Sequence, residues 1–150
     1  MIRTTLAVLC IASVQAGTPT LPPAPYSVKA KYDATLKSVV FTIVTKDIGW
    51  FGLGFGHAMD VGNDMIMCSV PSSGVAACTD FVSAGEKAPT KDTVQNVKAT
   101  AKKSATSAGF TEITVIRALD TTDAKQDYII PLDKQFEVSW SYNDKSAALD

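Results

Sequence analysis

The sequence predicts an all-β protein, a two-sheet antiparallel β-sandwich of the immunoglobulin-like kind with about 8 to 10 strands. Both ends of the region 26–142 alternate apolar and polar residues with the two-residue period of a half-buried strand. The segments between them are short, rich in β-branched and aromatic residues, and separated by turn signals. No segment shows a strong helical period, which argues against an α/β fold.

Residues 1–16 resemble an export signal. Arg3 supplies a basic start, residues 6–14 form an apolar run, and Val14-Gln15-Ala16 is typical of a small-residue cleavage site. We therefore expect residues 1–16 to be removed and the protein to be secreted. No later segment approaches the roughly 20 apolar residues of a membrane helix, so no membrane span is expected.

The rest of the chain divides into a leader and one domain. Residues 17–25, GTPTLPPAP, predict a stiff extended leader, a candidate for O-glycosylation. Residues 26–150 have a length suited to a single β-sandwich domain with one hydrophobic core.

The expected strands follow from alternation and turn signals. In chain order they are residues 26–32, 38–45, 50–56, 65–70, 75–81, 93–103, 110–119, 127–132 and 135–142. The lysine and alanine content of residues 93–103 also suits a helix, but Val97, Ala99 and Ala101 alternate with polar residues, which favours a strand. Residues 127–132 are expected at a sheet edge because Pro131 has no N–H to donate.

The cysteines predict one disulfide bond. Cys10 leaves with the signal, so Cys68 and Cys78 remain as an even pair in an oxidising compartment. A three-residue loop with Gly74 in the left-handed conformation would place these two cysteines directly opposite each other. A bridge across so short a loop should stabilise the fold by an amount near the low end of roughly 2 to 4 kcal/mol. The alternative is two buried thiols.

Composition argues against several classes of function. The chain has 14 basic and 15 acidic residues, and its only adjacent basic pair is Lys102-Lys103. Neither a nucleic-acid patch nor a basic membrane-surface helix is therefore indicated. With one histidine and no Gly-x-Ser-x-Gly or His-Glu-x-x-His motif, no nucleophile with its base and no catalytic zinc site is evident, and we expect a protein that is not an enzyme.

The segment GWFGLGFGHAMDVGNDMIM, residues 49–67, holds the candidate binding residues. Trp50 offers an aromatic face to a sugar ring, although strand tryptophans more often fill the core. Asp60, Asn63 and Asp64 offer oxygen ligands to calcium, but they lack the spacing of a dedicated loop and equally suit turns. The glycines suit close packing or bulges in a strand.

Five marks in order resemble the DOMON domain family, found in the amino-terminal part of dopamine β-hydroxylase and the cytochrome domain of cellobiose dehydrogenase. The resemblance covers nearly all of residues 26–142. The marks are GWFGLGFG, MDVGNDMIM, TDFVSAGEKAPTKDTVQ, FTEITVIRALDTTDAKQDY with its Arg and Asp-rich turn, and FEVSWSY.

The resemblance implies a β-sandwich with a ligand pocket at one end. Some members hold a b-type haem there, between a methionine after the Gly-Trp strand and a histidine near the carboxyl end; others are thought to bind sugars. Met59 matches the methionine, whereas the histidine has no counterpart after residue 142. His57 is a poor substitute, because residues two apart on an extended segment project to the same side.

Both ligand candidates also have ordinary structural explanations. Met59 suits a gap-filling core position, and His57 suits a solvent-facing loop position. A haem held by one protein ligand, or shared between two copies, stays open.

The sequence thus predicts a secreted, non-catalytic DOMON-type module that binds haem, with electron transfer as its role, or carbohydrate. The alternative is a self-assembling protein of an extracellular matrix or fibre, whose partners are copies of itself or other extracellular proteins meeting its sheet edges or leader.

Overall fold

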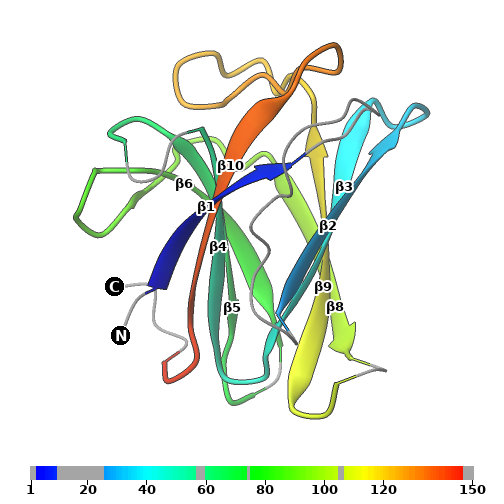
Figure 1. Cartoon of the computed structure of the whole chain (residues 1–150), viewed down its shortest axis with the longest axis vertical. Helices are drawn as coiled ribbons and strands as arrows, with labels where there is room; N and C mark the ends of the chain where they lie inside the picture. The colour runs from blue at the N-terminus through cyan, green and yellow to red at the C-terminus, as the bar shows by residue number, and fades with distance from the viewer. Residues whose placement is uncertain (1–2, 10–25, 57–59, 74, 105–106, 147–150) are drawn as a thin grey trace.

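The protein is a sandwich of two antiparallel sheets with no helix in the part of the chain that the structure describes (Figure 1). The computed structural model describes residues 3–9, 26–56, 60–73, 75–104 and 107–146. The predicted fold class is confirmed.

Ten strands make up the two sheets in the described residues. They are β1 (Arg3–Leu9), β2 (Ser27–Asp33), β3 (Ser38–Lys46), β4 (Gly49–Phe55), β5 (Asp64–Val70), β6 (Ala77–Val82), β7 (Thr90–Lys91), β8 (Val97–Lys103), β9 (Phe110–Ala118) and β10 (Phe136–Asn143). One sheet has the order β2-β3-β9-β8, and the other has the order β1-β10-β4-β5-β6-β7. Every pairing is antiparallel, as the short connections require.

The core lies between the sheets and follows the two-residue period of the sequence. In β9, for example, Thr111, Ile113, Val115 and Arg117 are buried and alternate with half-buried residues. The buried aromatic and aliphatic residues of both sheets form one hydrophobic cluster. Its fully buried members include Val39, Phe41, Ile43, Phe51, Ile66, Cys68, Val70, Ile113 and Val115. The predicted alternation of β2 and β10 is confirmed by the core contacts of Tyr26, Val28, Phe136, Val138 and Trp140.

The central strand β4 is buried on both faces. Its inward residues Phe51, Leu53 and Phe55 belong to the core. On the outer face, a Cβ at Gly54 would lie 2.6 Å from Ser139 Oγ of the neighbouring strand β10, so the sequence needs glycine there. The prediction that the glycines serve close packing fits this contact.

Residues 3–9 pair along β10 from Leu9 opposite Phe136 to Arg3 opposite Tyr142. The five strands β10-β4-β5-β6-β7 form a continuous sheet without this segment. Removal of residues 1–16 would therefore leave the sandwich intact and turn β10 into an edge strand. That removal stays a prediction.

Two expected strands differ from the structure. Residues 127–132 form no strand; the Asp127 N–H donates to the Asp123 carbonyl at 2.9 Å, and the Ile130 N–H donates to the Leu119 carbonyl at 2.9 Å. Pro131 has no N–H, and the start of the segment is held by side chains instead, as described below. Within residues 93–103, only Val97–Lys103 is a strand.

Candidate functional site

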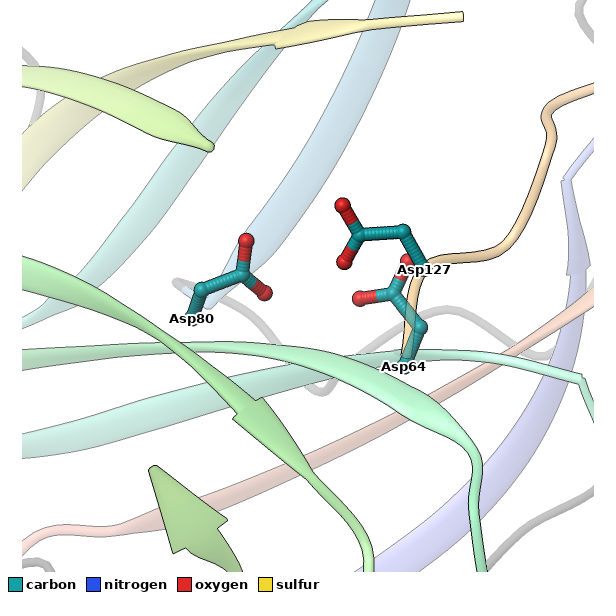
Figure 2. A group of neighbouring side chains, drawn as sticks. All are labelled: Asp64, Asp80 and Asp127. Carbon is teal, nitrogen blue, oxygen red and sulfur yellow. The ribbon is translucent and has the colours of Figure 1, made fainter. Parts of the chain in front are cut away.

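Three aspartates and one arginine meet inside one end of the sandwich. Asp64 begins β5, Asp80 lies on β6, and Asp127 lies on the segment between β9 and β10. Carboxylate oxygens from these three residues lie within 4.8 Å of one another (Figure 2). Arg117, near the end of β9, supplies the guanidinium. We call these four residues the acidic cluster.

Arg117 is fully buried and binds the cluster from the opposite sheet. Its Nη2 forms an ion pair with Asp64 Oδ2 and lies 3.9 Å from Asp127 Oδ1. Its Nη1 donates to the Ala118 carbonyl at 3.0 Å. The guanidinium carbon lies 4.9 Å from the centroid of the Phe55 ring, within the range of a cation–π contact. The ion pair thus joins the two sheets across the core.

Each aspartate has one oxygen held by a hydrogen bond. Asp64 Oδ2 accepts from the Tyr128 N–H at 2.8 Å, and Asp127 Oδ2 accepts from Asn96 Nδ2 at 2.7 Å. Asp80 Oδ2 accepts a longer bond from the Asn96 N–H, at 3.3 Å. The other oxygen of each carboxylate is buried and has no hydrogen-bond partner. The cluster is therefore rich in acceptors and short of donors.

Burial controls the acidity of this cluster. Desolvation raises the pKa of Asp64 from 3.8 to about 6, although the positive charge of Arg117 acts in the opposite direction. Desolvation also raises the pKa of Asp80, to about 7, and the negative charges of Asp64 and Asp127 raise it further. The positive charge of Arg117 is thus too little to hold the pKa values of Asp64 and Asp80 near 3.8.

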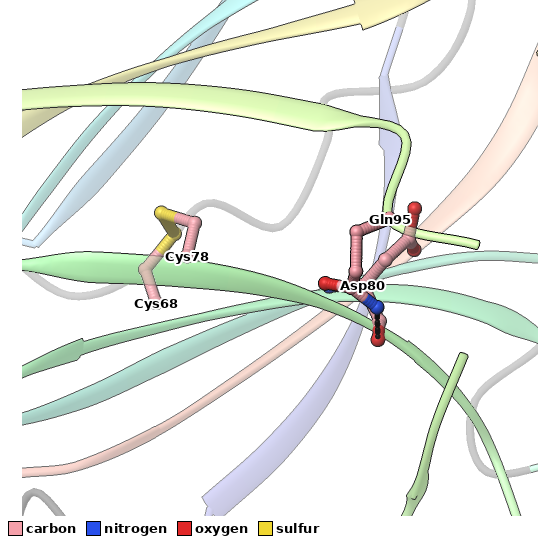
Figure 3. The surroundings of a disulfide bond; sticks show 4 residues. All are labelled: Cys68, Cys78, Asp80 and Gln95. Atoms are coloured by element: carbon pink, nitrogen blue, oxygen red, sulfur yellow. Dashed lines mark hydrogen bonds between the residues drawn. A yellow bond between two sulfur atoms is a disulfide. The ribbon is translucent and has the colours of Figure 1, made fainter. Parts of the chain in front are cut away.

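The neighbouring disulfide bond and Gln95 position Asp80 (Figure 3). Cys68 lies opposite Cys78 in the β5–β6 register, and the two are joined by the predicted disulfide. Cys78 and Asp80 are two residues apart, so they share the inward face of β6. The side chain of Gln95 accepts from the Asp80 N–H at 2.9 Å and donates to its carbonyl at 3.0 Å, as a neighbouring strand would. Both contacts fix the backbone that carries the carboxylate.

A shallow depression opens beside the cluster. Its volume is about 560 Å³, and it is lined by Ala124, Asp127, Tyr128, Ile129, Pro131, Asp133 and Lys134. The Tyr128 ring stacks on the Phe55 ring with centroids 6.3 Å apart. The depression therefore borders the acidic cluster at Asp127, and Tyr128 links its wall to Phe55 at the end of β4.

A match to a protein-family model identifies the family of this domain. The family model of the DOMON domain matches residues 24–143, more than half of the chain. The chain belongs to the DOMON domain family. No curated protein and no solved structure matches it. In the described part of this DOMON domain, no helix combines the length and apolar character needed to cross a membrane.

Two of the residues predicted to bind a ligand in this DOMON domain, His57 and Met59, lie outside the described residues. The described flanks of their connection are Gly56 and Asp60. Trp50 is 6% exposed and lies on the outer face of β4, opposite Ser69 and Asn143. Its ring offers no open face to a sugar, so Trp50 is a buried residue of the strand.

The structure does not bring together Asp60, Asn63 and Asp64, the candidate calcium ligands of the sequence analysis. The Asn63 N–H donates to the Asp60 carbonyl at 3.3 Å, which is the turn that the sequence also suggested. Asp60 is exposed, whereas Asp64 points into the core and joins Asp80 and Asp127. Sequence reasoning therefore missed the partners of Asp64. The available signal was the register, since Asp80 stands on the same face as the bridged Cys78.

Proposed function

We propose that this DOMON domain is a secreted, non-catalytic module that binds a small ligand at the end of the sandwich holding the acidic cluster. The observation that carries the proposal is that the connection bearing Met59 has both its flanking strands anchored on Arg117. β4 ends at Phe55, whose ring contacts the guanidinium, and β5 begins at Asp64, which pairs with it.

The depression at this end supports the proposal. Tyr128 lines it, stacks on Phe55 and donates its N–H to Asp64. An aromatic ring, aliphatic Ile129 and Pro131, and charged Lys134 give it a mixed lining, which is typical of small-molecule sites. The mixed lining of the depression therefore supports our placing the ligand at this end of the sandwich.

Haem is the ligand that we favour. Met59 is the residue matching the family's axial methionine, and the sequence places it between β4 and β5. The described residues contain no histidine, and Met65 and Met67 are buried within β5, so these residues do not complete a pair of axial ligands. The proposal is therefore a haem held through Met59 alone. When bound, haem would supply one-electron transfer.

Carbohydrate is a weaker candidate. Trp140 is 5% exposed and stacks within the core, and Trp50 is also buried. The exposed large hydrophobic side chains among the described residues are all aliphatic. The half-buried Tyr128 in the depression is therefore the aromatic ring that a sugar could reach, and neither tryptophan offers the open platform that sugars commonly use.

Two observations support a non-catalytic, secreted role. Asp64 and Asp80 are the described carboxyl groups with strongly raised pKa values, and both face Arg117 and each other inside the protein rather than a substrate. The Cys68–Cys78 disulfide suits an oxidising compartment. Sequencing the amino terminus of the secreted product tests the export signal directly.

An absorption spectrum tests the haem proposal. The purified protein, mixed with haemin and then reduced with dithionite, should show a Soret band and the α and β bands of reduced haem, and Met59→Ala should abolish them. Met65→Ala is the matched control, because it removes a thioether elsewhere in the same sheet. A protein that stays colourless with added haemin contradicts haem binding.

Self-assembly through the edges of the β2-β3-β9-β8 sheet is not favoured. The edge strand β8 is almost wholly exposed and carries Lys98, Lys102 and Lys103, while the opposite edge strand β2 carries Lys29 and Lys31. Charged residues on an edge oppose pairing with another copy. A strict monomer by light scattering at high concentration would agree with this argument.

A further inference from the structure

We propose that Asp64, Asp80 and Asp127 bind a divalent cation, and that Ca²⁺ is the ion they favour. This inference is separate from haem binding, because it rests on described residues of the core and not on the connection that carries Met59.

The three carboxylates converge from separate parts of the chain. β5 supplies Asp64, β6 supplies Asp80, and the segment between β9 and β10 supplies Asp127. Figure 2 shows the carboxylate of Asp80 facing those of Asp64 and Asp127, which lie side by side. The carboxylate oxygens lie within 4.8 Å of one another, a distance at which negative charges repel strongly. Three ionised carboxylates in this arrangement therefore need a compensating positive charge.

The second observation is the lack of hydrogen bonds at the oxygens that face inward. Oδ1 of Asp64, of Asp80 and of Asp127 is buried without a hydrogen-bond partner, and that of Asp127 lies 3.9 Å from Arg117 Nη2. Asp80 is fully buried and Asp64 is 2% exposed, so bulk water does not satisfy these atoms. Buried carboxylate oxygens are normally hydrogen-bonded or bound to a metal. Each residue therefore contributes one oxygen that makes no hydrogen bond, and these three oxygens could serve as ligands of a cation.

The charge of the cluster matches a divalent ion. Three carboxylates and one guanidinium leave two uncompensated negative charges when all are ionised. Arg117 cannot supply more charge, because a guanidinium carries a single positive charge; its Nη2 pairs with Asp64, its Nη1 binds the Ala118 carbonyl, and its Nε is buried without a hydrogen-bond partner. A single divalent cation would neutralise the remainder.

The donor chemistry selects Ca²⁺ among divalent ions. All the ligands are hard carboxylate oxygens, without the imidazole or thiolate that zinc prefers. Mg²⁺ retains several of its waters, which an enclosed site disfavours, whereas Ca²⁺ accepts irregular carboxylate coordination. Asp127 also lines the depression, which gives the ion a path from solvent.

Calorimetric titration of the EDTA-treated protein with CaCl₂ tests the proposal. We expect one Ca²⁺ per chain, binding more tightly than Mg²⁺, and a rise of several degrees in Tm at saturating Ca²⁺. Asp80→Asn keeps the size of the side chain and its acceptor for Asn96, and it should weaken Ca²⁺ binding at least about tenfold.

Two further variants complete the design. Asp60→Asn removes an exposed carboxylate from the neighbouring turn and should leave Ca²⁺ affinity unchanged. Asp127→Asn provides a second ligand variant if Asp80→Asn fails to fold. An unchanged Tm with Ca²⁺, equal losses of affinity in Asp60→Asn and Asp80→Asn, or tighter binding of Mg²⁺ than Ca²⁺ would each overturn the proposal.

Discussion

Arg117 and Asp64, which are 53 residues apart in the sequence, form a fully enclosed ion pair between the two sheets. Arg117 stands on the inward face of β9, and Asp64 stands on the inward face of β5. Removing either charge would leave the other buried and unpaired, which costs far more than the loss of a surface pair. The pair therefore fixes how the sheets face each other at the end where we place the ligand.

Arg117→Met should destabilise the fold strongly. The change keeps much of the side chain's apolar volume but leaves three buried carboxylates without a cation, so we expect a loss of roughly 3 to 5 kcal/mol in the free energy of unfolding. Urea denaturation followed by tryptophan fluorescence measures it.

Lys102→Met is the matched control for that experiment. Lys102 pairs with Glu112 at 3.0 Å, but its side chain is 72% exposed, so its loss should cost less than about 1 kcal/mol. Equal small losses for the two variants would show that the buried pair is not a structural anchor.

The metal-free protein should lose stability as the pH rises from about 4 to 7. The pKa values of Asp64 and Asp80 are raised in the folded state from 3.8 to about 6 and about 7. At pH values between the unfolded and folded pKa values, the folded protein binds more protons than the unfolded chain. The contribution of these two groups to the free energy of unfolding is therefore present at low pH and is lost as the pH rises through the folded pKa values. One pKa unit corresponds to about 1.4 kcal/mol.

Urea unfolding in EDTA at several pH values measures this slope. Asp80→Asn should flatten it, because an amide does not titrate. A slope of the same size in wild type and Asp80→Asn would assign the pH dependence to other groups.

Removal of the disulfide should weaken the fold and the cation site together. The Cys68→Ala/Cys78→Ala double variant loses a bond that closes a short loop, which should cost about 2 to 3 kcal/mol. Since Cys78 and Asp80 share a face of β6, Ca²⁺ affinity should also fall. Thermal unfolding and calorimetry of the double variant measure the two effects. A large loss of stability with unchanged affinity would show that Gln95 alone positions Asp80.

The sequence carries much information about the fold and less about the site. Alternation in β2 and β10 predicts the sandwich, and the spacing of Cys68 and Cys78 predicts their disulfide, because both depend on the local two-residue period. The cluster depends on contacts between distant strands. The 53-residue separation of Arg117 and Asp64 gives no local pattern, and an inward aspartate looks like a turn residue until the register is known.

Contacts between distant parts of the chain also explain why residues 127–132 do not form the strand that the sequence predicts. Its composition suits an edge strand, but the Tyr128 N–H is engaged by Asp64 and Asp127 is engaged by Asn96. Long-range side-chain contacts thus replace the backbone ladder that local propensity predicts.

Removal of residues 1–16 should leave β10 as an open edge. In the full chain, residues 3–9 cover that edge by antiparallel pairing. Alternate amides of β10 should therefore exchange with deuterium faster in the secreted protein than in the uncleaved chain. Equal protection in both would mean that another segment covers β10.

The acidic cluster is the centre of this account, and a crystal structure grown in CaCl₂ tests it most directly. The anomalous difference map should show one Ca²⁺ peak within about 2.6 Å of an oxygen from each of Asp64, Asp80 and Asp127. A map with no peak among these carboxylates would contradict the account.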